Sequence, residues 1–390
     1  MPAITAAQST IRRPDRVAAD EVDDADQIPF VARVADYAGT VLRPYGLRAD
    51  RDGVPPQRVA EFADVKLLNH LAPKEFGGAA LSRAADRRVH EILSGACLNT
   101  WLVWAQHAPI VGRLAKHRAR GGDLSQRAHD VLSGRLLVGA AISDVRRFPD
   151  HFVEATRVER GWRLNGTVSW FSGWGLNSAV FVAAVEPASR TVITSLIPID
   201  RHVTAGVLGL SALGGSRTQR IHLSNAPVAD ADVISVQPLD EWRREDVDTV
   251  SDARPQHFGL AARVIDELRA EREPIARKIA ERWAPRIAQI RADAYGLSDE
   301  AIAADAGPHR TQERLAVKAA SGEALSTLTR ALLIARSGHG IGFDDTAQLH
   351  ARSALFVLVQ GQNADVRRAQ LTHFLDTPHD PDTPTDPKDS

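Results

Sequence analysis

The sequence has 390 residues and is almost neutral, with 48 Lys and Arg against 49 Asp and Glu. Its 44% hydrophobic content is that of a soluble globular protein with a sizeable core. A near-neutral chain has no excess of cations to exchange for phosphate counterions, so we expect no nucleic-acid partner. Cys97 is the only cysteine, which excludes an internal disulfide and a thiolate zinc cluster, and fits a reducing cytoplasm.

The two ends of the chain have compositions unlike the rest. Residues 1–28 mix Arg with many Asp and lack an apolar core, so they predict a flexible leader rather than a signal peptide. Residues 377–390 are rich in Pro and Asp and predict a disordered tail. No apolar run approaches the roughly 20 residues needed to cross a bilayer, so we expect no membrane partner.

The first folded region is predicted to be helical over residues 29–138. Apolar residues recur there at helical spacing, as in Val89, Ile92 and Leu93. Pairs such as Gly77–Gly78 mark breaks between the helices.

The pattern changes over residues 139–236 to short runs rich in Val, Thr, Ile and Trp. Turn-forming pairs such as Asn165–Gly166 separate these runs, which favours a central antiparallel β domain. The predicted strands are 152–158, 162–168, 179–185, 192–197 and 220–223.

The helical period returns over residues 237–376 and predicts a C-terminal helical domain. Segregated blocks of helices, strands and helices indicate an α+β protein rather than a βαβ nucleotide-binding fold. No Gly-x-Gly-x-x-Gly or Walker loop is present, so NAD and ATP lack their usual sequence motifs.

Several short segments, weak one by one, follow a recognisable order from about Val31 to Phe374. They are 73–78, 141–144, 161–167, 170–173, 213–218, 223–228, 259–261, 340–343 and 366–368. In order and spacing they resemble the acyl-CoA dehydrogenase superfamily of flavoproteins, with an amino-terminal helical domain, a central β domain and a C-terminal helical bundle.

The resemblance implies a flavin, FAD or FMN, between the β domain and the C-terminal helices, with a neighbouring subunit completing its site in a homodimer or homotetramer. By position, Ser143 would bond the pyrimidine end of the ring, Trp170 would pack on it with Phe171, and Ser172 would lie near N5 and O4. A flat apolar wall and a few donors are what a flavin needs. The alternative for each residue is structural, because Trp170 on a β run is often core and Ser172 is beside a turn glycine.

The resemblance also assigns two residues to the cofactor phosphates. Arg272 is the retained arginine of an element that serves the pyrophosphate from the neighbouring subunit. Arg336 replaces a glutamine, and its guanidinium could bind a phosphate with two parallel bonds. The other residues of both elements differ, which predicts looser FAD binding.

The glutamate with which such dehydrogenases remove the α-proton of an acyl thioester is missing. Its usual position falls on Gly361, or on Gln360 if one gap is allowed, and its second known position falls on Thr249. The nearest carboxylate is Asp248, which lies in a charged stretch typical of a solvated surface.

Three hypotheses follow. The first is an oxygen-using flavin monooxygenase that takes reduced flavin from an NAD(P)H–flavin reductase. Its small-molecule substrate would lie in a pocket walled by Trp170, Phe171 and Trp174, where Ser172 and either Gln360 or Gln362 are neutral polar groups. The second is a divergent acyl-CoA or acyl-carrier dehydrogenase with Asp248 or an unrecognised carboxylate as relocated base. The third is a non-catalytic scaffold that has lost its flavin.

Histidines give little further guidance. They are scattered without a His-Glu-x-x-His motif, so no metal site is expected. His107, near Trp101 and Trp104, could line the substrate pocket, although a helix-packing histidine is the commoner situation.

Overall fold

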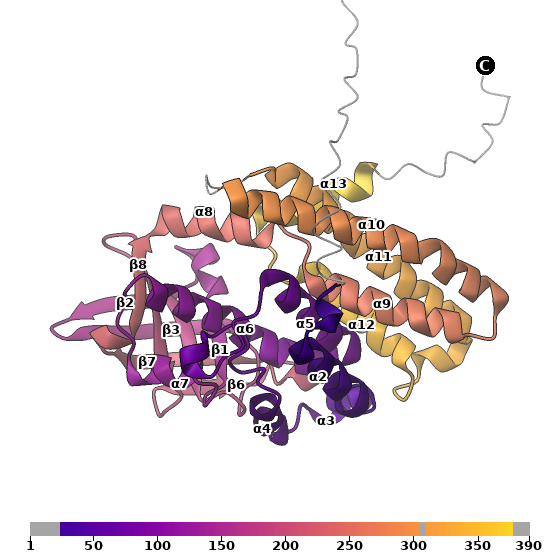
Figure 1. Ribbon diagram of the computed structural model, residues 1–390. Coiled ribbons are helices and arrows are strands. Elements are labelled where there is room, and N and C mark those ends of the chain that lie inside the picture. The colour runs from indigo at the N-terminus through magenta and orange to yellow at the C-terminus, as the bar shows by residue number, and fades with distance from the viewer. Residues whose placement is uncertain (1–23, 305–308, 377–390) are drawn as a thin grey trace, which may run out of the picture.

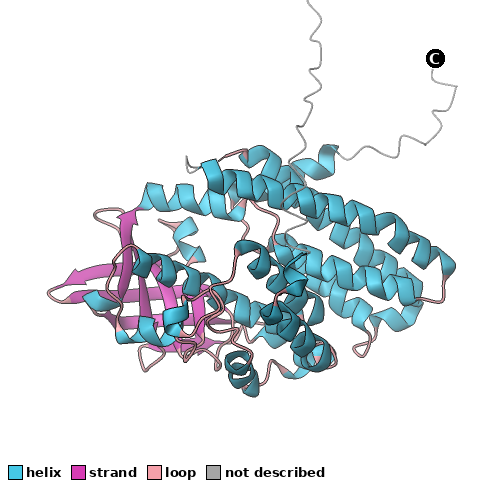
Figure 2. Ribbon diagram, in the orientation of Figure 1, coloured by secondary structure: helices cyan, strands magenta, loops and turns pink. Residues whose placement is uncertain are grey.

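The computed structural model describes residues 24–304 and 309–376. The predicted tail lies outside the described residues, as does the predicted leader except for residues 24–28. A β-sheet occupies one end of the molecule, and long helices extend from it to the other end (Figures 1 and 2).

The amino-terminal helices pack around α6, whose buried face includes Trp101 and Trp104. Serine side chains begin two of these helices, because Ser82 and Ser125 accept hydrogen bonds from free backbone amides of the first turn. The elements are η1 (Ala25–Gln27), α2 (Pro29–Tyr37), η2 (Ala38–Leu42), α3 (Gly46–Asp52), α4 (Gln57–Asp64), η3 (Lys74–Phe76), α5 (Arg83–Ala96), α6 (Leu98–Ala119) and α7 (Gln126–Leu132).

The central sheet has the strand order β6-β7-β3-β2-β4-β5-β8, with β1 beside β4. Most pairs are antiparallel, but β1 and β2 both pair with β4 in parallel. Strands β4 and β5 are buried on both faces along nearly their whole length. The elements are β1 (Val138–Ala141), η4 (Ser143–Arg147), β2 (Val153–Val158), β3 (Gly161–Phe171), β4 (Ala179–Glu186), β5 (Thr191–Pro198), β6 (Val203–Gly206), η5 (Gly214–Ser216), β7 (Gln219–Val228), η6 (Asp230–Asp232) and β8 (Val233–Pro238).

The carboxyl-terminal helices form a bundle that meets the amino-terminal helices where α5 crosses α9. A Cβ placed on Gly95 would lie 2.7 Å from the Gly259 carbonyl oxygen, and one on Gly259 would lie 2.2 Å from the Glu91 carbonyl oxygen. The crossing therefore requires glycine on both helices. The elements are α8 (Leu239–Val250), α9 (Pro255–Ala270), α10 (Pro274–Ala304), α11 (Thr311–Arg336), η7 (Ser337–Ile341), α12 (Thr346–Val359) and α13 (Ala364–Asp376).

This architecture confirms the predicted α+β class and the order of helices, sheet and helices. Every predicted strand is present, whereas β1, β6 and β8, of four to six residues each, were not predicted. Within the described part of the chain, no helix is both long and apolar enough to span a membrane.

Candidate active site

Trp170 and Phe171 end strand β3 and point to opposite faces of the sheet, because successive strand residues alternate. Trp170 is 46% exposed, whereas Phe171 is fully buried. The Phe171 ring lies so close under β1 that a Cβ on Gly139 would come within 2.4 Å of it. The half-buried Trp174 packs on the other side of Phe171, with ring centroids 6.2 Å apart. Trp170 is thus the aromatic surface open to a ligand, and the structure gives Phe171 a packing role.

Ser143 begins η4, the short helix that follows β1. The next residue, Asp144, accepts hydrogen bonds from the backbone N–H and the hydroxyl of Ser169, both 2.8 Å, and so ties η4 to β3 just before Trp170. Ser143 itself is half-buried, and its hydroxyl has no hydrogen-bond partner among residues 24–304 and 309–376. Ser143 therefore carries an unengaged donor next to the aspartate that ties η4 to β3.

The Ser172 hydroxyl is engaged within the protein. It lies 2.8 Å from the Thr218 hydroxyl, which lies 2.7 Å from the Ser216 hydroxyl. Ser216 donates to the Leu213 carbonyl oxygen at 2.7 Å. Since each hydroxyl has one hydrogen, the chain is satisfied when Ser172 donates to Thr218 and Thr218 donates to Ser216. Ser172 then has no hydrogen left for a ligand unless this chain rearranges.

His107 uses both of its ring nitrogens on the backbone. Its Nδ1 accepts from the Val138 N–H at 3.2 Å, and its Nε2 donates to the Leu68 carbonyl oxygen at 2.7 Å. Burial lowers the pKa of His107 to about 4, so the ring is neutral at pH 7. These contacts tie α6 to β1, which is the packing role raised as the alternative from the sequence.

The predicted base position lies at the end of α12. Gln360 follows the last helical residue, and its side-chain oxygen accepts a 2.9 Å hydrogen bond from the buried Gln256 amide. Gly361 has a φ of +68°, and a Cβ there would lie 4.0 Å from Val250 at the end of α8. A neutral amide pair therefore stands at the position that the sequence resemblance predicts for the base.

Asp248 lies on α8, two residues before Val250. The carboxylate of Asp248 pairs with the guanidinium of Arg314, which is 3% exposed and also binds Asp252 at 2.6 Å. Asp248 is therefore committed to an ion pair rather than left as a free carboxylate.

Arg272 and Arg336, predicted to bind cofactor phosphates, lie together at the end of the bundle opposite to the sheet. Arg272 is exposed in the connection between α9 and α10, which Figure 1 shows far from the strands. Arg336 ends α11 and bonds the neighbouring carboxylate of Glu271 at 2.8 Å. Within one chain, neither arginine can reach a flavin stacked on Trp170.

The surroundings of Arg336 are acidic. Its guanidinium donates to Glu267 and Asp345, both at 2.7 Å, in addition to Glu271. Arg263 also pairs with one of these carboxylates, at 2.9 Å from Glu267. Three carboxylates thus face two guanidinium groups and the imidazole of His350, and both guanidinium groups are already paired, which disfavours a phosphate at this point. The ring-binding side of the predicted site fits a flavin, but its phosphate side does not.

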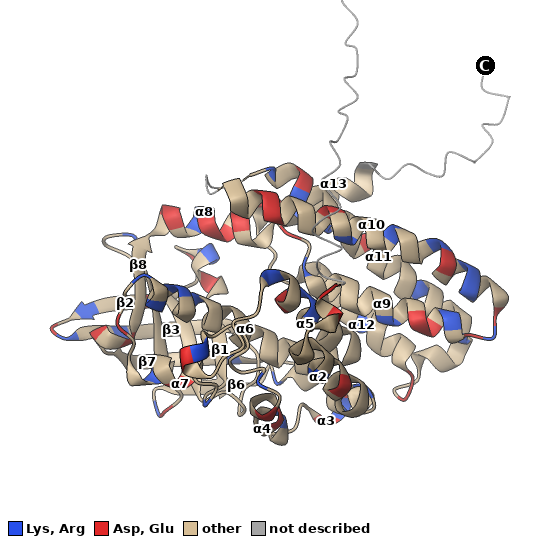
Figure 3. Cartoon of the chain, viewed as in Figure 1, with Lys and Arg blue, Asp and Glu red and all other residues tan. Residues whose placement is uncertain are grey.

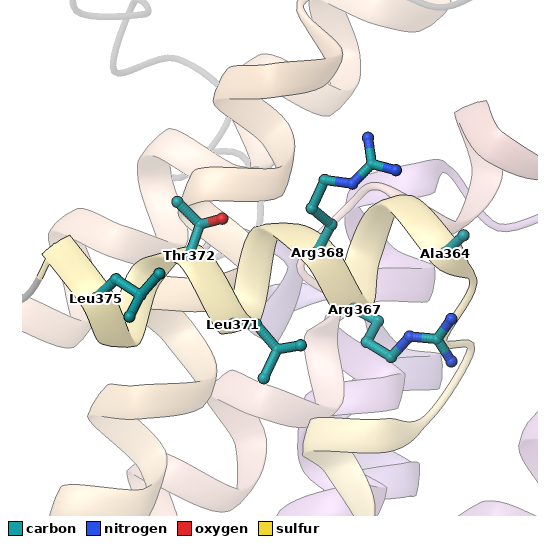
Figure 4. Close-up of a pocket in the computed structure, with 6 residues that line it drawn as sticks. All are labelled: Ala364, Arg367, Arg368, Leu371, Thr372 and Leu375. Atoms are coloured by element: carbon teal, nitrogen blue, oxygen red, sulfur yellow. The ribbon is translucent and has the colours of Figure 1, made fainter.

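A shallow groove of about 310 Å³ runs along α13. Figure 4 shows Arg367 and Arg368 diverging from the helix beside Leu371 and Leu375. Leu371 and Leu375 are 60% and 85% exposed. All the lining residues come from this one helix, so the groove is a surface feature and contains none of the predicted site residues.

Sequence reasoning missed Lys318 on α11, which is 3% exposed. Its amine donates a hydrogen bond to the carbonyl oxygen of Val250. Val250 follows Thr249 in the sequence and lies beside Gly361. The signal was present: Lys318 falls at a core position of a helical stripe that includes Leu315, Ala319 and Leu325, all buried. No group of three His, Cys, Asp or Glu side chains suited to a metal ion occurs within the described residues.

Comparison with known proteins agrees with this architecture. The family model for the acyl-CoA dehydrogenase N-terminal domain matches residues 24–121. A search of curated protein sequences finds no match.

Solved structures match the chain over nearly its whole length at low sequence identity. Butyryl-CoA dehydrogenase from Megasphaera elsdenii matches with a TM-score of 0.72 and 12% identity, covering 91% of this chain and 98% of its own. A glutaryl-CoA dehydrogenase from Mycobacterium smegmatis, solved in complex with FADH2, matches with a TM-score of 0.68 and 17% identity, covering 92% and 96%. A structure reported for the electron transferring flavoprotein of Acidaminococcus fermentans matches with a TM-score of 0.74 and 13% identity, covering 90% and 98%. The amino-terminal region therefore matches the acyl-CoA dehydrogenase N-terminal domain family, and the chain has the fold of the acyl-CoA dehydrogenase superfamily.

Proposed function

We propose that this protein is a flavin-dependent oxidoreductase that uses reduced flavin and oxygen to oxygenate a small molecule, with a separate reductase supplying the flavin. A bound flavin would supply the electron transfer and, when reduced, the reaction with oxygen. One observation carries the proposal: the base position holds the neutral pair Gln256 and Gln360. The nearest predicted carboxylate, Asp248, is paired with Arg314.

The residues on the sheet side support flavin binding. The exposed face of Trp170 can stack on the ring, and the free hydroxyl of Ser143 can donate to its polar edge. An unoccupied donor aimed at an atom whose charge grows on reduction stabilises the reduced state. These two residues are the ones we assign to ring binding.

A second candidate is an acyl-thioester dehydrogenase with a relocated base, because two of the matching structures are named butyryl-CoA and glutaryl-CoA dehydrogenases. Asp248 is then the first residue to test, since a third of its side chain is exposed. A scaffold without flavin is the third outcome.

The assembly proposed for the flavin is a homodimer or homotetramer. Arg272, exposed and remote from Trp170, can meet a cofactor only on a neighbouring subunit. FADH2 is present in one matching structure, which favours FAD, whereas the acidic surroundings of Arg336 favour FMN.

The test of function is to mix the protein anaerobically with reduced FMN or FAD, admit oxygen, and record flavin absorbance and oxygen consumption. Slowed reoxidation of flavin by the protein, together with oxygenated product from added amines, thioethers or phenols, is the expected result. Anaerobic bleaching of bound oxidised flavin by butyryl-CoA would replace our proposal with the dehydrogenase. Failure to bind flavin in either redox state would leave the scaffold.

Trp170→Ala tests the binding surface separately. Loss of ring stacking is expected to weaken flavin binding by about three- to tenfold. Stability should change little because Trp170 is nearly half exposed. Trp283→Ala on α10 is the matched control, since it removes a partly buried indole from another part of the protein. Equal flavin affinity of the two variants, measured by fluorescence titration, would contradict the assignment of Trp170.

A further inference from the structure

The buried amine of Lys318 lies where α11 meets the end of α8. It donates a hydrogen bond to the Val250 carbonyl oxygen. This contact uses one of two N–H bonds when the amine is neutral, and one of three when it is charged. Among residues 24–304 and 309–376, no carboxylate lies within ion-pair distance of this amine. A buried ammonium without an opposite charge is costly.

Charged groups on three other segments face Lys318. Burial, together with the charges of Arg254 at the start of α9 and Arg146 on η4, lowers the pKa of Lys318 from 10.5 to about 7. Asp252 and Asp246 act in the opposite direction. The amine is therefore poised between its neutral and charged forms near neutral pH.

The remaining elements around Lys318 contribute little negative charge. His257 on α9 is neutral, because burial, followed by Lys318, lowers its pKa to about 3. Gln360 at the end of α12 and Val366 on α13 carry no charge. Arg314, on the helix of Lys318, holds Asp248.

The carboxylates of this junction are already used. Arg146 binds Asp246 through two hydrogen bonds of 2.7 and 2.8 Å. Arg254 has only the Thr249 carbonyl oxygen as a side-chain partner among the described residues. Lys318, the charged groups that act on it and their ion-pair partners form a set of four cations, Arg146, Arg254, Arg314 and Lys318, and three carboxylates, Asp246, Asp248 and Asp252, so the net charge of this set is +1 when Lys318 is protonated. One negative charge is missing.

We propose that this junction binds the anionic group of a small organic molecule, with Lys318 and Arg254 as its two cationic contacts. Arg254 is partly exposed and forms the outer side of the junction, while Lys318 forms its buried side. The bound molecule would be a substrate of the proposed function. Only this identification rests on that function. Arg146 belongs to the same short helix as Ser143, and Val250 lies beside Gly361.

Binding of the anion takes up a proton. An anion beside the amine favours the ammonium form, so the bound complex keeps Lys318 charged to higher pH than the free protein does. Affinity should be greatest below about pH 7 and should fall by up to tenfold for each pH unit above it, until the pKa of the complex is reached. A lysine that only caps the Val250 carbonyl oxygen predicts no such dependence.

The experiment is calorimetric titration of the full chain, without flavin, with benzoate and with the neutral benzamide. Performed near pH 8 in two buffers of different ionisation enthalpy, it should show binding of benzoate with uptake approaching one proton, and no comparable binding of benzamide. Lys318→Met should weaken benzoate binding at least tenfold and abolish proton uptake. Arg254→Gln should weaken binding and retain the uptake.

Arg330→Gln is the control, because Arg330 is an exposed residue of the same helix, and its titration should match that of the wild type. Equal heats for benzoate and benzamide, or undiminished proton uptake in folded Lys318→Met, would overturn the proposal. Failure of the flavin proposal would leave these results unchanged, since no flavin is present in the titration.

Discussion

The carboxyl-terminal helices bury charge at both of their ends, with opposite balance. Near the sheet, the junction around Lys318 has one more cation than carboxylate when the lysine is protonated. At the far end, the cluster around Arg336 has three carboxylates, Glu267, Glu271 and Asp345, against Arg336 and Arg263. Both signs otherwise alternate along these helices (Figure 3).

The two ends therefore differ in what they can accept. A negative group is attracted to the junction, where a cation lacks a carboxylate partner, and repelled from the far end, where the arginines are already neutralised. In a protein with almost no net charge, these local imbalances decide where an anion binds.

The largest loss of stability is expected when a carboxylate is removed from the far end of the bundle. Glu267 is 5% exposed and binds Arg336, Arg263 and His350, so Glu267→Gln should lower the free energy of unfolding by about 3 kcal/mol. Urea unfolding at pH 7 measures this loss. Glu323→Gln, which removes a partner of the exposed Arg330, should change stability by less than about 0.5 kcal/mol.

The same variant has a predictable response to acid. Burial raises the pKa of Glu267, but hydrogen bonds from His350 and Thr346 and the charge of Arg263 outweigh it and hold the pKa far below the ordinary 4.5. The wild type therefore gains this stabilisation in full above about pH 4.5 and loses it as the pH falls. A stability difference between wild type and Glu267→Gln that did not shrink below pH 4 would contradict this account.

The junction near the sheet should respond in the opposite way to loss of its charge. Lys318→Met replaces a buried amine by an apolar chain of similar length, so we expect a gain on the order of 2 kcal/mol at pH 7. The pKa of Lys318 is lowered from 10.5 to about 7, so the folded wild type carries its full penalty below pH 7 and sheds it as the pH rises toward 10.5. The gain should accordingly vanish near pH 10. Parallel stability profiles of wild type and variant over this range would show that Lys318 is not strained by its burial.

The smallest expected effect concerns the cofactor. If the acidic cluster at Arg336 repels phosphates, the ADP portion of FAD adds little, and FAD and FMN should bind within about tenfold of each other, or 1.4 kcal/mol. Any remaining preference for FAD should depend on the exposed Arg272, so Arg272→Ala should remove it while the exposed Arg282→Ala does not. A preference for FAD of several hundredfold, measured by fluorescence titration, would contradict the claim that the acidic cluster at Arg336 repels phosphates.

The architecture could be predicted from the sequence because hydrophobic periodicity changes sharply near residues 138 and 238. The side-chain partners could not be predicted. Arg336 was expected to bind a phosphate, but the pairing with Glu267, 69 residues earlier, depends on how α9 and α11 pack. The opposite facing of Trp170 and Phe171 could have been read from strand alternation. The partner of Lys318, a backbone oxygen on another helix, leaves no trace in sequence pattern.

The glycine crossing of α5 and α9 has a consequence for motion. Gly95 and Gly259 bring the two backbones into direct contact, and interlocked surfaces of this kind cannot slide without first separating. The two helical regions therefore behave as one rigid body at this crossing.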